Sequence, residues 1–263
     1  MQRGLIFDCD GVLADTELHG HLVAFNLMWQ KMGVPWSWSS VQYEEKLKIG
    51  GGKERMASLF HDPDFRRAFK IPESEEERTA LIVSWHKEKT AIFEEIIASG
   101  KVPPRSGIKR LSQEALSAGW RLAVASTSAQ PAVAAVLRQA VGELASEFSI
   151  FAGDVVRAKK PAPDIYLFAI GQLGIPPSQC IAIEDSRNGL LSARAAQIPV
   201  VVTVSEFTKE EQFDGARLVV TSLGDPQGEK SEVLANRTGR EVGDFVDLKN
   251  LESVIEGAGV CSD

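Results

Sequence analysis

Cysteine is scarce in this sequence, and the few cysteines form no binding pattern. Only three occur among 263 residues, and they lie far apart, at Cys9, Cys180 and Cys261. They are odd in number and lack the CxxC or Cys/His spacing of a zinc site. The pattern argues against a structural zinc centre and favours a reducing compartment.

Long apolar runs and an excess of positive charge are also absent. No uninterrupted apolar run approaches the ~18 residues that cross a bilayer, and the start of the chain lacks the charged and apolar regions of a signal peptide. The formal net charge of −7 gives no long-range attraction for nucleic acid or an anionic membrane. We therefore expect a soluble protein without nucleic-acid or membrane partners, in which a local cationic pocket holds any anionic substrate.

Short apolar runs bounded by turn residues recur along the chain. They are brief, aliphatic and nearly continuous, which is typical of buried parallel strands, and they lie at 4–7, 121–126, 180–184, 199–204 and 217–220. Stretches with helical spacing lie between them, at 107–119, 130–141, 162–174 and 186–197. The alternation predicts an α/β fold with a doubly wound, Rossmann-like parallel sheet.

One interval breaks this alternation. Residues 16–97 contain amphipathic stretches but no convincing strand, which predicts an all-helical domain inserted after the first strand. We expect a core of residues 1–15 and 98–263 around this insertion. Residues 222–245 are polar and Gly-rich without periodicity, which predicts a surface loop.

Polar side chains stand at or just after the ends of several predicted strands. In a parallel sheet, ligands bind beyond the carboxyl ends of the strands, so these side chains are candidates for a site. They are Asp8 and Asp10 at the first run, Ser126 and Thr127 at the second, and Glu184 and Asp185 at the third, with Lys159 and Lys160 before a predicted helix.

The acidic residues indicate a cation. Asp8 and Asp10 are two apart, so in extended geometry both side chains point to one side of the strand. Asp185 adds another of the hard oxygen ligands that Mg2+ prefers. Ser126 as a donor and Lys160 as a compact positive charge suit the oxygens of a phosphoryl group. Each residue taken singly is also explained by a turn, a helix cap or a solvated lysine, but the set favours function.

Four segments resemble, in order, the four motifs of the haloacid dehalogenase superfamily of phosphatases, in which a helical cap follows the first motif. They are "DCDGVLADTE", "ASTS", "KKPAPD" and "IEDSRNG", and the resemblance spans most of residues 4–205. Val12 stands where many members have threonine. Only the backbone turn is needed there, so we expect an active enzyme.

This resemblance implies a division of roles. Asp8 would be the nucleophile that forms an aspartyl-phosphate, and Asp10 the acid that protonates the leaving alcohol and then the base that activates water. Asp8, the backbone carbonyl of Asp10, and Asp185 would hold Mg2+, with Glu184 behind them. The residues that would bind the transferring phosphoryl group are Ser126 and Lys160.

The inserted helices resemble those of CbbY-type proteins, the xylulose-1,5-bisphosphate phosphatases of photosynthetic organisms, and the plant and algal branch in particular. The resemblance rests on "DTELHGHLVAFN", Tyr43 and "KIGGGKERM". It implies hydrolysis of xylulose 1,5-bisphosphate, an inhibitory Rubisco by-product, to xylulose 5-phosphate. We expect a monomer, located in the chloroplast stroma as a mature chain without its transit peptide, with the cytoplasm as the alternative.

A bisphosphate needs two anion sites, and the cap offers residues for the second. Consecutive glycines at 50–52, including Gly51 and Gly52, can present backbone N–H groups to a phosphate. The residues that would add charge are Lys48, Lys53 and Arg55. The groups that would bind the sugar between the two sites are Glu17, His21, Tyr43 and Thr127. Packing explains Tyr43 and His21 equally well, whereas a flexible turn is the less favoured alternative for the glycines.

Other functions remain open from the sequence. Phosphoglycolate phosphatase and β-phosphoglucomutase share all four core motifs. A 2-haloacid dehalogenase is disfavoured, because its chemistry needs neither Mg2+ nor a second acid such as Asp10. A phospho-aspartate signalling module combines similar groups on a parallel sheet, but it has no need of Asp10 or of a helical insertion.

Overall fold

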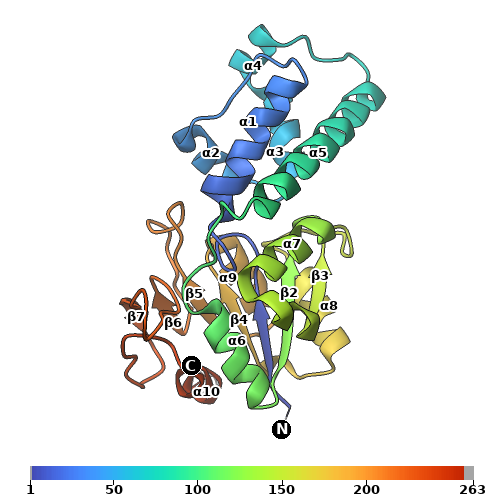
Figure 1. Ribbon diagram of the computed structural model, residues 1–263. Helices are drawn as coiled ribbons and strands as arrows, with labels where there is room; N and C mark the ends of the chain where they lie inside the picture. Colours follow the sequence, from blue (N-terminus) through green and yellow to red (C-terminus); the bar gives the residue numbers. More distant parts are fainter. Residues whose placement is uncertain (1, 258–263) are drawn as a thin grey trace. The chain divides into compact units, whose positions relative to one another are not determined.

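The computed structural model of the protein describes residues 2–257 (Figure 1). The chain divides into two compact units. The core unit holds the residues up to Asp15 and those from Pro103 onward, and the cap unit is Thr16–Val102. The sequence predicts that residues 1–15 and 98–263 carry out catalysis and that residues 16–97 select the substrate. This assignment of roles stays a prediction.

A seven-stranded sheet with the order β3-β2-β1-β4-β5-β6-β7 forms the centre of the core unit. All neighbours pair in parallel except β7, which is antiparallel to β6. The strands are β1 (Gly4–Phe7), β2 (Arg121–Ser126), β3 (Phe148–Ala152), β4 (Cys180–Glu184), β5 (Val200–Thr203), β6 (Leu218–Val220) and β7 (Val233–Asn236). The predicted doubly wound sheet is confirmed.

The strand order places a switch point between β1 and β4. From β1 the order runs outward through β2 and β3 on one side, and from β4 through β5 and β6 on the other. Every residue of β1 and β4 is buried, as expected of central strands covered on both faces. The carboxyl ends of these two strands are therefore the expected ligand-binding edge of the core unit.

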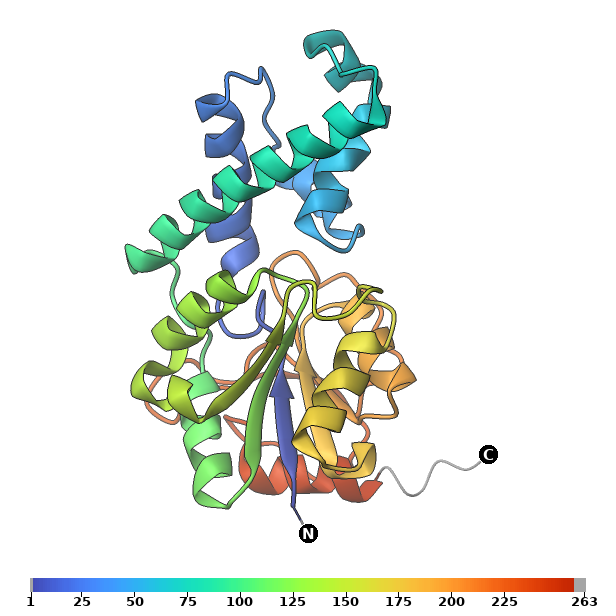
Figure 2. The same cartoon turned by 90° about the vertical axis from the view of Figure 1, so that its right-hand side faces the viewer.

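Helices cover both faces of this sheet (Figure 2). Helices α6 and α7 pack on one face and α8 and α9 on the other, while α10 packs against α6 and β4. Their bounds are α6 (Ile108–Ser117), α7 (Gln130–Val141), α8 (Asp164–Leu173), α9 (Arg187–Ala195) and α10 (Leu248–Glu256), with short 3-10 turns η3 (Gly142–Glu147) and η4 (Pro177–Gln179). Apolar side chains of α8 and α9, such as Ile165 and Leu190, are buried against Ile6 and Ala123 of the sheet.

The segment 222–245 is not wholly a loop, so that prediction is wrong in part. It contains β7, which pairs with β6 and places Asn236 opposite Leu218. Most of β7 is exposed, and its three consecutive apolar residues stand in a polar, Gly-rich stretch, so the sequence gives only a short signal for a strand. The guanidinium of Arg110 donates hydrogen bonds to the carbonyls of Leu223 and Val246, and so holds the chain on either side of β7 to α6.

The cap unit contains helices and no strand among residues 16–102, all of which the structure describes. The helices are the π-helical turn η1 (Glu17–His21), α1 (Leu22–Lys31), α2 (Ser40–Leu47), α3 (Gly52–Ser58), η2 (Leu59–His61), α4 (Pro63–Ala68) and α5 (Glu75–Ala98). Aromatic rings fill their centre: Trp38 stands edge-on to Trp29 with ring centroids 4.5 Å apart, and Phe25 touches both. Trp38 is buried and serves in packing.

Within the described part of the chain, no helix is both long and apolar enough to span a bilayer. The thiols of Cys9 and Cys180 are buried and form no disulfide among the described residues, and Cys261 lies outside those residues.

Candidate active site

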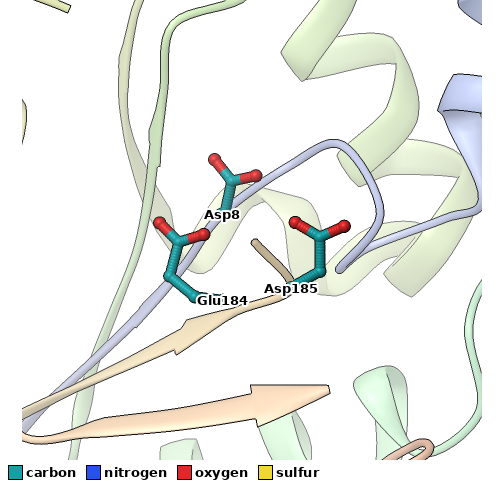
Figure 3. A group of neighbouring side chains, drawn as sticks. All are labelled: Asp8, Glu184 and Asp185. Atoms are coloured by element: carbon teal, nitrogen blue, oxygen red, sulfur yellow. The ribbon is translucent and has the colours of Figure 1, made fainter. Parts of the chain in front are cut away.

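Three carboxylates meet at the ends of β1 and β4 (Figure 3). One oxygen from each of Asp8, Glu184 and Asp185 lies within 4.8 Å of the others. The backbone N–H of Asp8 donates to the carbonyl of Ile183 at 2.9 Å, which extends the pairing of the two strands up to the site. The Ser186 side chain then accepts from the N–H of Gly189, so α9 starts directly after Asp185.

A single lysine pairs with two of these carboxylates. The ammonium of Lys160 lies 2.6 Å from Oδ1 of Asp8 and 2.6 Å from Oε1 of Glu184, and its side chain is 9% exposed. The hydroxyl of Tyr166, which is fully buried, donates to the same oxygen of Glu184. Burial works to lower the pKa of Lys160, but Asp8 and Glu184 outweigh it and hold that pKa above its ordinary value.

Burial and like charge act strongly on the aspartates. Desolvation, with the nearby charges of Glu184 and Asp10, raises the pKa of Asp8 to about 7 although Lys160 opposes the shift. Burial, followed by the charges of Asp8 and Glu184, raises the pKa of Asp185 well above its ordinary value. One lysine thus leaves an excess of negative charge in a poorly hydrated place.

The donor set fits a hard divalent cation. All ligand atoms of the group are carboxylate oxygens, which are the ligands that Mg2+ and Ca2+ prefer. The second oxygen of Glu184 is buried and has no hydrogen-bond partner among the described residues. A cation here would offset the charge that raises the pKa values of Asp8 and Asp185.

A tight turn after β1 carries Asp10. Gly11 adopts φ +77°, its N–H donates to the carbonyl of Ala14 at 3.0 Å, and a Cβ at this glycine would overlap the carboxylate of Asp185. The carboxylate of Asp10 is not one of the three grouped above. It accepts a hydrogen bond from the hydroxyl of Ser128 at 2.5 Å. That the backbone carbonyl of Asp10 binds a metal stays a prediction.

The end of β2 contributes hydroxyl groups beside β1. Ser126 is the buried last residue of the strand, and its Oγ accepts a hydrogen bond from the N–H of Ser128 at 3.1 Å. Thr127, between them, is half-buried. Roles for Ser126 and Thr127 were predicted from the sequence. Ser128 was missed, although all three residues belong to the motif "ASTS".

In the cap unit, three of the predicted substrate residues lie together. The hydroxyl of Tyr43 donates to Glu17 at 2.6 Å, and the guanidinium of Arg55 donates to the Tyr43 oxygen at 3.0 Å and lies 3.5 Å from Glu17. Arg55 also donates to the carbonyl of Ile49 at 3.0 Å. This cluster is mostly buried, since the Arg55 and Glu17 side chains are only 13% and 14% exposed.

The other predicted cap residues have different surroundings. His21 is buried and stacked on Phe93, and its Nδ1 lies 2.6 Å from the ammonium of the buried Lys89, which the sequence analysis missed. Lys48 is 68% exposed and pairs with Glu45 at 2.7 Å. The residues at the start of α3 are Gly51, which has φ +99°, Gly52 and the half-buried Lys53.

Comparison with known proteins identifies the family of this chain. The haloacid dehalogenase-like hydrolases match residues 2–197. The chain belongs to that family. The CBBY-like protein of Arabidopsis thaliana is 43% identical over 234 residues, which cover 89% of this chain and 73% of that protein.

Solved structures agree with this assignment. CbbY from Rhodobacter sphaeroides, solved with phosphate, is 39% identical with a TM-score of 0.75, over 84% of this chain and 95% of that one. A mutant of that CbbY, solved with xylulose 1,5-bisphosphate, is 38% identical with a TM-score of 0.75 over the same shares of the two chains. The chain is thus a CbbY-like phosphatase of the haloacid dehalogenase-like family, and the family predicted from the sequence is confirmed.

Tyr166 is a further residue that sequence reasoning missed. It lies on α8, six residues after Lys160, where its spacing is that of a core-facing aromatic residue. Nothing in that pattern distinguishes a packing tyrosine from one whose hydroxyl binds a carboxylate of the candidate site. Only the fold brings its hydroxyl to Glu184.

Because the three carboxylates bring negative charge close together, we expect the charge of Asp185 to destabilise the folded protein. Without added cations, Asp185→Asn should raise the free energy of unfolding at pH 8 by about 1 kcal/mol. The folded-state pKa of Asp185 is raised above the ordinary value of 3.8. The loss of folding stability that its ionisation causes is therefore absent below pH 3.8 and grows as the pH rises. The gain should therefore shrink toward pH 4, and denaturant unfolding in EDTA measures it.

Asp214→Asn is the matched control, since that side chain is 83% exposed and should change stability by less than about 0.5 kcal/mol. A loss of stability in Asp185→Asn at pH 8, or a gain that is the same at pH 4, would contradict this account of the site.

Proposed function

We propose that the protein is a Mg2+-dependent sugar-bisphosphate phosphatase that converts xylulose 1,5-bisphosphate to xylulose 5-phosphate through a phosphorylated Asp8. The observation that carries the proposal is the group of Asp8, Glu184 and Asp185 around Lys160 at the switch point of the sheet. The choice of substrate is supported by similarity to a CbbY that was solved with this sugar. The stromal location and the monomeric state stay predictions.

The first half-reaction uses Asp8 and Asp10. A carboxylate oxygen of Asp8 attacks phosphorus, the bond from phosphorus to the sugar oxygen breaks, and the carboxyl of Asp10 gives its proton to that oxygen. Asp8 must be ionised to attack. Lys160, at 2.6 Å from Asp8, favours the ionised form and supplies positive charge near the transferring group.

The second half-reaction restores the enzyme. Asp10, now a carboxylate, takes a proton from a water molecule whose oxygen attacks the phosphorus on Asp8. The bond between phosphorus and Asp8 breaks, inorganic phosphate leaves, and Asp8 is again a carboxylate. The hydroxyl of Ser126, at the end of the neighbouring strand, and the ammonium of Lys160 would hold the phosphoryl oxygens through both halves.

Mg2+ would be held by Asp8, Asp185 and the backbone carbonyl of Asp10, with Glu184 acting through Lys160. When bound it neutralises charge on the phosphoryl oxygens and on the crowded carboxylates. Support for this cofactor comes from the oxygen-only ligand set and from the raised pKa values of Asp8 and Asp185.

We assign the second phosphate and the sugar hydroxyls to the cap unit. Arg55 and Lys53 lie on α3, which begins at Gly52 directly after Gly51, and supply charge and N–H donors. The Glu17–Tyr43 pair, joined to Arg55, offers hydrogen-bonding groups of both kinds to a sugar. The residues that complete the proposed set are His21, Lys48, Gly51, Gly52 and, from the core unit, Thr127.

A panel of phosphate esters tests the function. Phosphate release should require Mg2+, be fastest with xylulose 1,5-bisphosphate, yield one phosphate per sugar and cease in EDTA. Asp8→Asn should lose all measurable turnover because the nucleophile is gone, whereas Asp214→Asn, an exposed carboxylate, should keep it. Faster release from 2-phosphoglycolate, or conversion of β-glucose 1-phosphate to glucose 6-phosphate, would support the alternative enzymes. No release from any ester would overturn the proposal.

We expect substitutions of two cap residues to raise the KM for the bisphosphate more than the KM for a monophosphate. Lys53→Ala and Arg55→Ala should each raise the KM for the bisphosphate about tenfold, roughly 1.4 kcal/mol, and change the KM for a pentulose monophosphate less than about twofold. Steady-state kinetics on both substrates measures the split. The control is Lys87→Ala, which removes an exposed charge from α5 of the same unit. Equal losses on both substrates would count against a second phosphate site here.

A further inference from the structure

The end of β2 carries three hydroxyl residues in a row, and the structure gives two of them different tasks. Ser126 is the last residue of the strand, and its Oγ accepts the N–H of Ser128 at 3.1 Å. A serine hydroxyl has one proton and two lone pairs, so this bond leaves the proton of Ser126 for donation elsewhere. The hydroxyl of Ser128 donates its proton to Oδ2 of Asp10 at 2.5 Å.

The bond between Ser128 and Asp10 joins distant parts of the chain. The two residues are 118 positions apart, and both belong to the core unit. The sheet brings them together, because β1 and β2 are direct neighbours in parallel and both residues follow the carboxyl ends of these strands. The Ser126–Ser128 bond in turn fixes the backbone from which the Ser128 hydroxyl reaches Asp10.

The bond from Ser128 acts on the Asp10 side chain itself. The turn at Gly11 fixes the backbone of Asp10, through the bond from Gly11 N–H to Ala14, and the Ser128 hydroxyl contacts the carboxyl. In the same way, the ammonium of Lys160 holds the carboxylate of Asp8. Proton transfer to a leaving oxygen works only when donor and acceptor come within hydrogen-bond reach, so a freely rotating acid loses rate.

We propose that Ser128 is a positioning residue that fixes the carboxyl of Asp10 for proton transfer. The proposal rests on the proposed function, in which Asp10 protonates the leaving sugar oxygen. It predicts that Ser128 matters when the leaving group needs a proton and is dispensable when the leaving group departs as a stable anion. A role in loop packing alone would make no such distinction.

Leaving-group dependence tests this inference. For Ser128→Ala, kcat/KM with the best sugar phosphate should fall about 10- to 100-fold, because part of the general-acid contribution is lost. The same variant should keep kcat/KM for p-nitrophenyl phosphate within about threefold, since nitrophenolate leaves unprotonated. Acetyl phosphate, whose leaving group is also a stable anion, serves where the aryl ester is turned over too slowly. The quantity compared is kcat/KM, which reports the steps up to phosphoryl transfer to Asp8.

Two further variants control the comparison. Ser128→Thr keeps the hydroxyl and should recover most of the rate on the sugar phosphate. Ser117→Ala, which removes an exposed hydroxyl bonded only within α6, should leave both substrates unchanged. A crystal structure of Ser128→Ala should show the Asp10 carboxyl displaced while Asp8 and Lys160 keep their contact.

The possible outcomes distinguish a failure of the role of Ser128 from a failure of the proposed function. Equal losses on both substrate types, no loss on either, or an Asp10 carboxyl that stays in place without the serine would overturn the role of Ser128 while the phosphatase stands. A wild-type protein that releases phosphate from no ester would instead overturn the proposed function.

Discussion

Three crowded carboxylates, two of them paired with one lysine, are the constraint on which the rest of the site depends. Asp8, Glu184 and Asp185 lie at the ends of the two central strands, where little water reaches them, and Lys160 compensates only part of their charge. Such an arrangement costs stability in the free protein. Under the proposed function, a divalent cation would offset the negative charge of the carboxylates, and a phosphoryl group would offset the positive charge of the lysine.

The backbone around the site is shaped to permit this crowding. Gly11 and Gly189 stand where a Cβ would overlap the carboxylates of Asp185 and Glu184, so both positions require glycine. Tyr166, fully buried on α8, donates its hydroxyl to Glu184 and so helps to fix the carboxylate that holds Lys160. The turn after β1 sets Asp10 apart from the three grouped carboxylates, which suits a residue that must move a proton rather than carry a permanent charge.

Residues at strand ends could be predicted from their position alone, whereas Lys160, on the segment before α8, was predicted with the help of a motif and several residues on other elements were missed. Asp8, Glu184 and Asp185 follow buried apolar runs, and the parallel sheet brings such positions to one edge. Ser128, Tyr166 and Lys89 lie on a loop or on helices, where their types also suit a turn, a core or a solvated face. The strand β7 escaped prediction for a related reason, because this exposed edge strand has only three consecutive apolar residues within a polar, Gly-rich stretch.

The central claim is that Asp8 itself carries the phosphoryl group, and trapping that group tests it most directly. The Asp10→Asn variant retains the nucleophile but lacks both the acid of the first half-reaction and the base of the second. It should be mixed with Mg2+ and acetyl phosphate, whose leaving group departs as a stable anion without a proton, and quenched in acid. Peptide mass spectrometry should then find one phosphoryl group on Asp8, and none when Asp8 is also replaced by asparagine. Turnover in the wild type with Asp8 never modified in either protein, or a phosphoryl group on another residue, would contradict the account.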